Sequence, residues 1–558
     1  MQLIFTFAGS FNFAVKSINM RLTSFVLLTL FSGLVFAQNQ SKPKLIVGVV
    51  VDQMRFDYLT KFDSHYSEDG FKRLKREGFE AKNLHFNYVP TYTGPGHASI
   101  FTGTSPMNHG IISNTWYDKF QDDFVYCAGD DNVNSLGTDA RDGQMSPHRM
   151  LTTTFADQNR LHTQFRGKTI GISIKDRGAI LPAGHTANAA YWFYGKDKGH
   201  FISSTFYQDE LPKWVKKFNK SKVVENYLKK DWNTFKNIES YTESGSDLNN
   251  YEHGFEGKDE ATFPYNLKAL NKQNGQFDIL KATAFGNSII VDFAKEAIKA
   301  EDLGQDEHTD VLTVSFSSTD YVGHNFGVNS KEIQDTYIRL DRDIANLLNF
   351  LDSKVGKDSY TLFLTADHGA VHVPQFLKDR NIPAGYFDTK QLEADLNSHL
   401  NKIGFENVIK NVSNQQIFLN YGLLETQANS VQVQREIKHF LLQYPKIDRV
   451  FTRENLAQSS ASTRAEALIK NGFHPKRSGD IIFAFEPSYI SYPKKGSTHG
   501  SGLNYDTQAP FLLYGQGVKP GYTYKKLFIT DIAPTISALL GIEMPNGATG
   551  SVIEEALD

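Results

Sequence analysis

Cysteine is almost absent from this chain, and positive and negative charges nearly balance. The 558 residues include a single cysteine, Cys127, which excludes an intramolecular disulfide and a thiolate metal cluster. We interpret Cys127 as a small buried apolar residue. The formal net charge is −3 and no long basic run occurs, which argues against nucleic acid as a stable partner. With 40% apolar and 13% aromatic residues, the chain can build a large core and must rely on it for stability.

Long apolar runs are missing except near the N-terminus. Met20 and Arg21 precede an apolar run at 22–31, and short residues lead to Ala37. This pattern predicts a signal peptide over residues 1–37, cleaved after Ala37, with Met20 as a candidate true start. The alternative is a buried N-terminal helix. Because the run is too short for a membrane span, we expect an exported chain of residues 38–558, periplasmic or secreted, without a span.

Strand-length apolar runs recur along the rest of the sequence, and helical patterns lie between them. Continuous apolarity is typical of strands covered on both faces. The runs are at 45–51, 169–174, 310–316, 360–365, 481–485 and 510–514. Helices are predicted at 330–351, capped by Ser330, at 289–298, and at 530–540, ended by Gly541. The alternation predicts an α/β fold with a doubly wound, mainly parallel central sheet and helices on both faces.

Two stretches interrupt the alternation. Residues 183–275 are aromatic, polar and rich in turn formers, and residues 371–478 mix short helical and strand patterns. Neither contains a cluster of residues typical of catalysis. We expect both to be insertions that cap the site of a catalytic domain at 38–558 and shape access to it.

Carboxylates and imidazoles stand at the ends of several apolar runs. In an open α/β sheet, ligands bind outside the carboxyl ends of the strands, so residues at these positions are expected to meet. Oxygen and imidazole nitrogen are ligands for one or two Zn²⁺ ions. The candidates are Asp52, Asp320, His324, Asp367, His368 and His499. The pattern predicts one metal centre assembled from distant segments.

A loop that enters a predicted helix contains Thr93. At the N-terminus of that helix, backbone N–H groups and the helix dipole favour an anion. A hydroxyl there can be activated by a metal, as bound water is. From the local sequence alone, a plain N-cap role for Thr93 is the better explanation.

Three further polar residues complete a candidate anion site. Asn114 lies in a turn-like stretch, and its simpler interpretation is a turn residue. Lys175 and Arg177 follow the run at 169–174; on an extended strand, residues i and i+2 point the same way. The simpler interpretation of this pair is surface charge. Together with the metal candidates, the three describe a site for a tetrahedral dianion.

These motifs resemble those of the alkaline phosphatase superfamily, and most of all its monomeric, phosphate-irrepressible PafA-type members. The resemblance runs from about Lys44 to the C-terminus. It rests on V-V-D-Q-M-R at 50–55, T-G-P-G-H at 93–97, I-K-D-R at 174–177, S-T-D-Y-V-G-H at 318–324, A-D-H-G at 366–369, S-T-H-G at 497–500 and T-D-I-A-P-T at 530–535.

The resemblance implies a zinc-dependent alkaline phosphatase that hydrolyses phosphate monoesters for phosphate scavenging. It implies two Zn²⁺ per chain, one held by Asp320, His324 and His499 and the other by Asp52, Thr93, Asp367 and His368. It also implies Thr93 as the nucleophile that forms a phosphothreonine, with Asn114, Lys175 and Arg177 on the phosphoryl oxygens. A monomer is the expected state.

Other functions are weighed against this one. A phosphodiesterase or nucleotide pyrophosphatase of the same superfamily would share the metals and Thr93, but Lys175 and Arg177 favour a monoester dianion. A sulfatase would need a C-x-P-x-R motif, which the surroundings of Cys127 do not match. A phosphoglycerate mutase would be cytosolic and use other ligands. A non-catalytic exported metal-binding protein remains an alternative of another class.

Overall fold

The computed structural model describes residues 42–427 and 430–558. The predicted leader at 1–37 lies outside the described residues. Pro43–Asp558 form one compact unit. In the part of the chain that is described, no helix is both long enough and apolar enough to cross a membrane.

A large α/β sheet forms the centre of this unit, which confirms the predicted fold class. Five neighbouring strands at its middle run parallel to one another. In spatial order they are β12 (Tyr360–Thr365), β1 (Leu45–Val51), β11 (Asp310–Phe316), β6 (Thr169–Ser173) and β7 (Ala189–Tyr194). Their side chains are almost entirely buried, as continuous apolar runs predict.

Antiparallel strands extend the sheet on both sides. β19 (Gln508–Gly515) pairs with β12, and β2 (Phe79–His85) follows it. On the other side β8 (His200–Ser204) pairs with β7. Both β7 and β8 fall within the stretch at 183–275, so part of the first expected insertion continues the central sheet.

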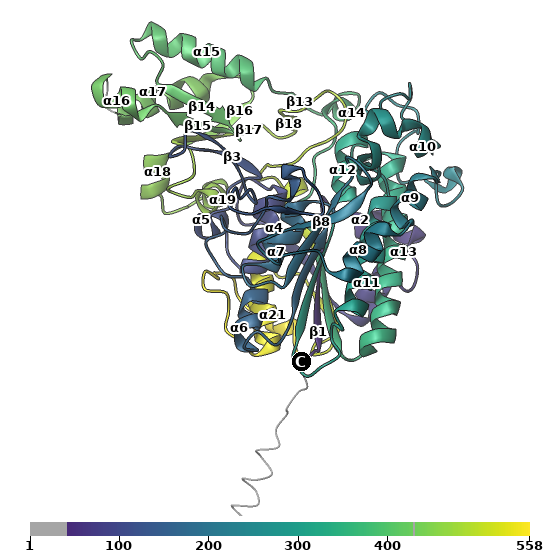
Figure 1. The fold of residues 1–558 in the computed structure, drawn as a ribbon. Coiled ribbons are helices and arrows are strands. Elements are labelled where there is room, and N and C mark those ends of the chain that lie inside the picture. The colour runs from purple at the N-terminus through teal and green to yellow at the C-terminus, as the bar shows by residue number, and fades with distance from the viewer. Residues whose placement is uncertain (1–41, 428–429) are drawn as a thin grey trace, which may run out of the picture. The chain divides into compact units, whose positions relative to one another are not determined.

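Helices cover both faces of the sheet (Figure 1). One side carries α4 (Thr93–Thr102), α7 (Asp176–Ala183) and α21 (Ile532–Leu540), and the other carries α11 (Phe285–Ala300) and α13 (Lys331–Leu351). The Ser330 hydroxyl accepts a hydrogen bond from the backbone N–H of Ile333, which confirms the predicted cap of α13. Gly541 ends α21 in the left-handed conformation, also as predicted.

A second, smaller sheet lies in the region 387–485. It orders β14 (Ile409–Ser413), β15 (Gln416–Leu419), β17 (Ile481–Phe485) and β16 (Ile447–Thr452), with α15 (Thr389–Lys402) and α17 (Ser430–Gln443) packed on it. Its core is separate and includes Leu392, Leu396, Val433, Ile437, Ile481 and Phe483. The apolar run at 481–485 is therefore a strand, but it belongs to this small sheet, which we call the cap sheet.

Candidate metal centre

The structure brings all six candidate ligands to one edge of the central sheet. In the register of the parallel strands, Val50 lies opposite Ser315 and Thr365, so β1, β11 and β12 end together. The loops and the short helix α12 (Ser318–Phe326) that follow these ends carry five of the side chains, and the loop before β19 carries His499. The residues brought together are Asp52, Asp320, His324, Asp367, His368 and His499.

Each of the three histidines presents the same nitrogen to the centre. Nδ1 of His324 lies 2.7 Å from the carbonyl of Ser497, and Nδ1 of His499 lies 2.7 Å from the carbonyl of Thr91. Nδ1 of His368 contacts the carbonyl of Gly369 at 3.0 Å. Because a carbonyl only accepts, each Nδ1 carries the proton. Nε2 is therefore the nitrogen left with a lone pair for a metal.

The side chains form two groups, and within each group the ligand atoms lie within 4.8 Å of one another. The first group is Asp320, His324 and His499, and the second is Asp52, Asp320 and His368. In the first group, Asp320 Oδ1 is 3.1 Å from His324 Nε2 and 3.6 Å from His499 Nε2. In the second, Asp52 Oδ1 is 3.4 Å from His368 Nε2. Asp367 Oδ2 approaches that same nitrogen at 3.7 Å. Asp320 thus faces both groups.

The donor set fits divalent cations. Within the described residues, Asp52 Oδ1 and His368 Nε2 are buried without a hydrogen-bond partner, which is costly unless a ligand satisfies them. Burial, with Asp320 and Asp367 nearby, raises the pKa of Asp52. Burial likewise lowers the pKa of His368 and His499, which keeps them neutral. A cation would relieve the repulsion among the carboxylates, and neutral imidazoles are the form that binds one.

Thr93 stands beside this centre as the first residue of α4. Tyr92 occupies the N-cap position with extended backbone, so the plain N-cap role for Thr93 is wrong. Thr93 is 1% exposed. A Cβ on Gly96 would come within 2.4 Å of the carbonyl oxygen of Asp367. Gly96, the second glycine of T-G-P-G-H, therefore lets the first turn of α4 lie directly against the loop after β12 that carries Asp367.

Lys175 is a buried cation at the junction of these groups. Its Nζ lies 2.7 Å from Asp52 Oδ2 and 3.5 Å from Thr93 Oγ1, and it also contacts Asp320 Oδ2. Burial opposes its charge, but the carboxylates of Asp320 and Asp52 outweigh burial and raise the pKa of Lys175. Lys175 is therefore a permanent positive charge next to the Thr93 hydroxyl.

Lys175 and Arg177 do not lie on an extended strand, so the predicted i, i+2 alignment of the two side chains is wrong. β6 ends at Ser173, Lys175 is the N-cap of α7, and Arg177 lies in the first turn of that helix. The two residues are therefore not neighbours on one strand face. Asn114 Oδ1 accepts a hydrogen bond of 2.7 Å from the backbone N–H of Gly94, which ties Asn114 to the start of α4.

Sequence reasoning missed three supporting residues, and two of them, Gln53 and His97, contact the metal-binding side chains. Gln53 has a positive φ of 64°, and its side chain donates to Asp320 Oδ1 at 2.7 Å while its backbone N–H donates to Asp367 Oδ1. His97 Nδ1 lies 2.9 Å from the Thr93 carbonyl and 3.2 Å from Asp367 Oδ2. Gln53 lies in V-V-D-Q-M-R and His97 in T-G-P-G-H, so their positions within these motifs could have indicated a role at the site.

The third missed residue is Tyr126, at the end of β4 (Asp123–Tyr126). Its hydroxyl donates to Asp176 Oδ1 at 2.5 Å and accepts a hydrogen bond of 3.0 Å from Arg177 Nη1. The hydrogen bonds that link Asp176 to Tyr126 and Tyr126 to Arg177 fix one edge of the Arg177 guanidinium. No local pattern around Tyr126 indicates this contact.

Comparison with known proteins agrees with this geometry. The model of the type I phosphodiesterase / nucleotide pyrophosphatase family matches residues 46–522. The chain belongs to this family of the alkaline phosphatase superfamily.

Several relatives match the chain over nearly their whole length. Alkaline phosphatase PafA of Elizabethkingia meningoseptica is 42% identical, over 94% of this chain and 97% of its own. A protein of Myroides odoratus named calcium-transporting ATPase is 48% identical, over 95% and 97%. The crystal structure of wild-type PafA superimposes with a TM-score of 0.89 at 42% identity, covering 93% of this chain and 99% of that one. The PafA-type resemblance is thereby confirmed, and a phosphatase function is supported.

Proposed function

We propose that the protein is a zinc-dependent alkaline phosphatase that hydrolyses phosphate monoesters through a phosphothreonine at Thr93. The observation that carries the proposal is the position of the Thr93 hydroxyl. It lies at the N-terminus of α4, 3.5 Å from Lys175 Nζ, beside two groups of metal-binding side chains. This combination supports attack by an alcohol on an anionic phosphorus centre.

The proposal includes two zinc ions, although Asp320 belongs to both groups of ligand atoms and is assigned here to the first ion alone. Asp320, His324 and His499 would hold one, and Asp52, Asp367, His368 and the Thr93 oxygen the other. When bound, zinc supplies Lewis acidity that lowers the pKa of a coordinated hydroxyl and neutralises charge on oxygen.

The residues of the chain perform the two displacements as follows. Thr93 Oγ1 bonds to phosphorus as its proton is lost, the ester P–O bond breaks, and the alcohol leaves with a proton. The oxygen of water then bonds to phosphorus and the bond to Thr93 breaks, which returns a proton to Oγ1 and releases inorganic phosphate. His97 orients the first turn of α4 through the Thr93 carbonyl. Positioning and charge stabilisation supply most of the rate enhancement for such a loose transition state.

Lys175, Arg177 and Asn114 favour a monoester over a diester. Because Oδ1 of Asn114 is occupied by Gly94, its amide nitrogen is the end available to a phosphoryl oxygen. Two cations and an amide donor match the charge of a dianion, whereas a diester carries a single charge and an added substituent. The second candidate is a phosphodiesterase, which the matched family model favours by its description.

Turnover on one zinc-loaded sample tests the proposal. We expect 4-nitrophenyl phosphate to exceed bis-(4-nitrophenyl) phosphate in kcat/KM by at least about a hundredfold, corresponding to about 3 kcal/mol or more in transition-state stabilisation. A preference for the diester would establish the phosphodiesterase. ATP should be tested as a third substrate, because the Myroides odoratus relative is named an ATPase. Bound metal without any turnover would favour a metal-binding protein without activity.

Export and a monomeric state are further parts of the proposal. The pattern at 20–37 supports cleavage after Ala37. N-terminal sequencing of the protein recovered from outside the cytoplasm tests this, with Gln38 as the expected first residue. Light scattering tests the monomer.

A further inference from the structure

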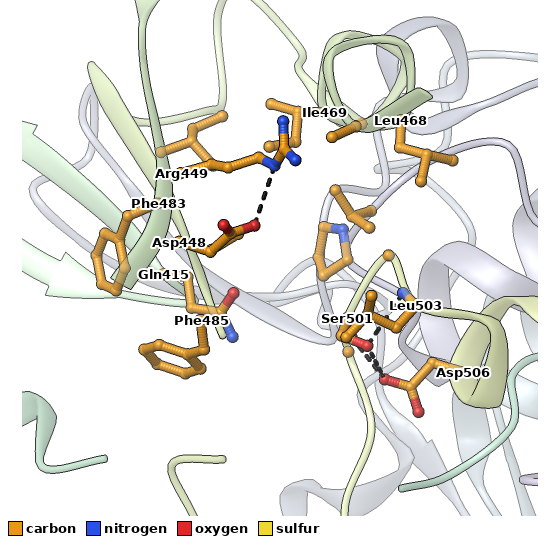
Figure 2. Close-up of a pocket in the computed structure, with 18 of the residues that line it drawn as sticks. Gln415, Asp448, Arg449, Leu468, Ile469, Phe483, Phe485, Ser501, Leu503 and Asp506 are labelled. Atoms are coloured by element: carbon orange, nitrogen blue, oxygen red, sulfur yellow. Dashed lines mark hydrogen bonds and ion pairs between the residues drawn. The ribbon is translucent and has the colours of Figure 1, made fainter. Parts of the chain in front are cut away.

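A cavity of about 590 Å³ adjoins the candidate metal centre. Figure 2 shows Phe483 and Phe485 of the cap sheet on one side, with Leu468 and Ile469 of α19 (Arg464–Gly472) closing it above. The opposite side is formed by Ser501 and Leu503 of the loop after His499 and by Asp506 of the short helix α20 (Asn504–Thr507). The volume is within the range of small-molecule sites.

Two lining residues connect this cavity to the chemistry. His499 belongs to the wall, and its Nε2 lies 3.6 Å from Asp320 Oδ1 in the metal centre. Tyr92 also belongs to the wall and directly precedes Thr93 in the chain. The rings of Tyr92 and His499 meet edge to face, with centroids 5.6 Å apart. A molecule in the cavity therefore contacts the ring of one metal-binding residue and the residue next to Thr93.

The chemistry of the walls selects an apolar ligand. Leu468, Ile469 and Phe483 are each at least nine-tenths buried, yet they face the space. Charged groups also line the space: Arg449 Nε pairs with Asp448 at 3.0 Å, and Arg464 donates to the neutral Thr507 hydroxyl at 3.1 Å. Asp506 accepts a hydrogen bond from Ser501 through Oδ2, and its Oδ1 has no partner among the described residues. Both arginines already have partners, and the aliphatic and aromatic side chains of α19 and the cap sheet offer their contacts to an uncharged organic group.

We propose that this cavity binds the organic group of the phosphate monoester, so that the enzyme prefers aryl or similarly apolar monoesters. The inference rests on the proposed function and adds the substrate class. On this inference, the cap sheet and α19 determine which substrates are preferred, while the residues at the edge of the central sheet determine the rate of the chemical step.

Two substrates that differ by one ring test the preference. Phenyl phosphate and 4-phenylphenyl phosphate have similar leaving groups, and the second adds one apolar ring. We expect the wild-type kcat/KM to be about tenfold higher for the larger substrate, because that ring is removed from water in the cavity.

Variants that fill the cavity test whether the preference for the larger substrate arises there. Ala465 of α19 and Ala484 of β17 line it from two elements. In A465F and A484F, kcat/KM for 4-phenylphenyl phosphate should fall at least about tenfold, with phenyl phosphate changed less than about threefold. A467F is the matched control, because Ala467 lies on the same helix but does not line the cavity. Thermal unfolding verifies that all three variants fold.

Binding of the product alcohol provides a readout independent of turnover. By calorimetry, 4-phenylphenol should bind wild-type protein and A467F alike and should lose at least tenfold in affinity for A465F. Equal losses for both substrates, or unchanged binding in A465F, would overturn the inference. If neither substrate is hydrolysed, the proposed function fails, and the binding series alone decides whether the cavity takes an apolar group.

Discussion

The central sheet and the cap sheet are assembled in opposite ways. The candidate metal centre collects side chains from four separated segments, which meet because parallel strands end at one edge. The cap sheet comes from one stretch, 387–485, and has its own apolar core. The first arrangement makes every ligand depend on the register of the main fold. The second permits substitution in the cap without disturbing the centre, which suits a region that selects substrates.

The largest expected effect comes from removing the Thr93 hydroxyl. T93A should lower kcat for phenyl phosphate by about a thousandfold or more, since the nucleophile is lost while the fold is kept. Rapid quenching with ³²P-labelled substrate should label wild-type protein and T93S but not T93A. Retained labelling in T93A would place the nucleophile elsewhere and break the assignment of chemistry to the central sheet.

Metal removal comes next. Chelation should reduce turnover by at least about a hundredfold and lower Tm, because Asp52, Asp320 and Asp367 would then repel one another in a buried site. Added Zn²⁺ should restore both. Elemental analysis should give two zinc ions per chain, and H324A should lower that number. Unchanged Tm and activity after verified metal loss would contradict the metal centre.

Replacing Lys175 sharpens the distinction between monoester and diester. K175A should lower kcat/KM for phenyl phosphate by about a hundredfold, since a buried charge 3.5 Å from Thr93 Oγ1 is lost. The diester rate should change by less than about tenfold. R177A should show the same pattern. Equal losses for both esters would mean that Lys175 serves the fold through Asp52 and Asp320.

A smaller effect is expected at Tyr126. Y126F removes the hydroxyl that links Asp176 to Arg177, and it should cost about tenfold in monoester kcat/KM through misplacement of the guanidinium. In R177A, the added Y126F change should have no further effect. Y117F is a matched control, because Tyr117 of β3 (Thr115–Asp118) also bonds to an aspartate, Asp122, but near the turn of the β3–β4 hairpin and not at the end where Tyr126 lies.

Damage to the cap core should leave the chemistry intact. Ile437 is fully buried in the core of the cap sheet, so I437A should destabilise the region by about 2–4 kcal/mol. Hydrogen exchange should accelerate in β14–β17, whereas turnover of phenyl phosphate below the unfolding temperature should stay within about twofold. A parallel loss of turnover would show that the two regions are energetically coupled.

Sequence reasoning predicted the elements of the central sheet well, because their signals are local. β1, β11 and β12 match their apolar runs, and the Ser330 cap and the Gly541 stop follow from side-chain size and hydrogen bonding. The apolar pattern also predicted a strand at 481–485. It did not indicate that this strand belongs to the cap sheet, because strand pairing depends on partners that are distant in sequence.

The sequence by itself determined which groups the chemistry has available: the aspartates and histidines after apolar strands, Thr93 before a helix, and Lys175 beyond β6. Only the tertiary structure decided how they act. It selected Nε2 in each histidine through a carbonyl, brought Gln53 and Tyr126 into supporting contacts, and placed the cap sheet beside His499 to form a cavity. Residue type and strand pattern are properties of neighbouring positions, whereas these contacts join segments up to hundreds of residues apart and exist only once the register is set.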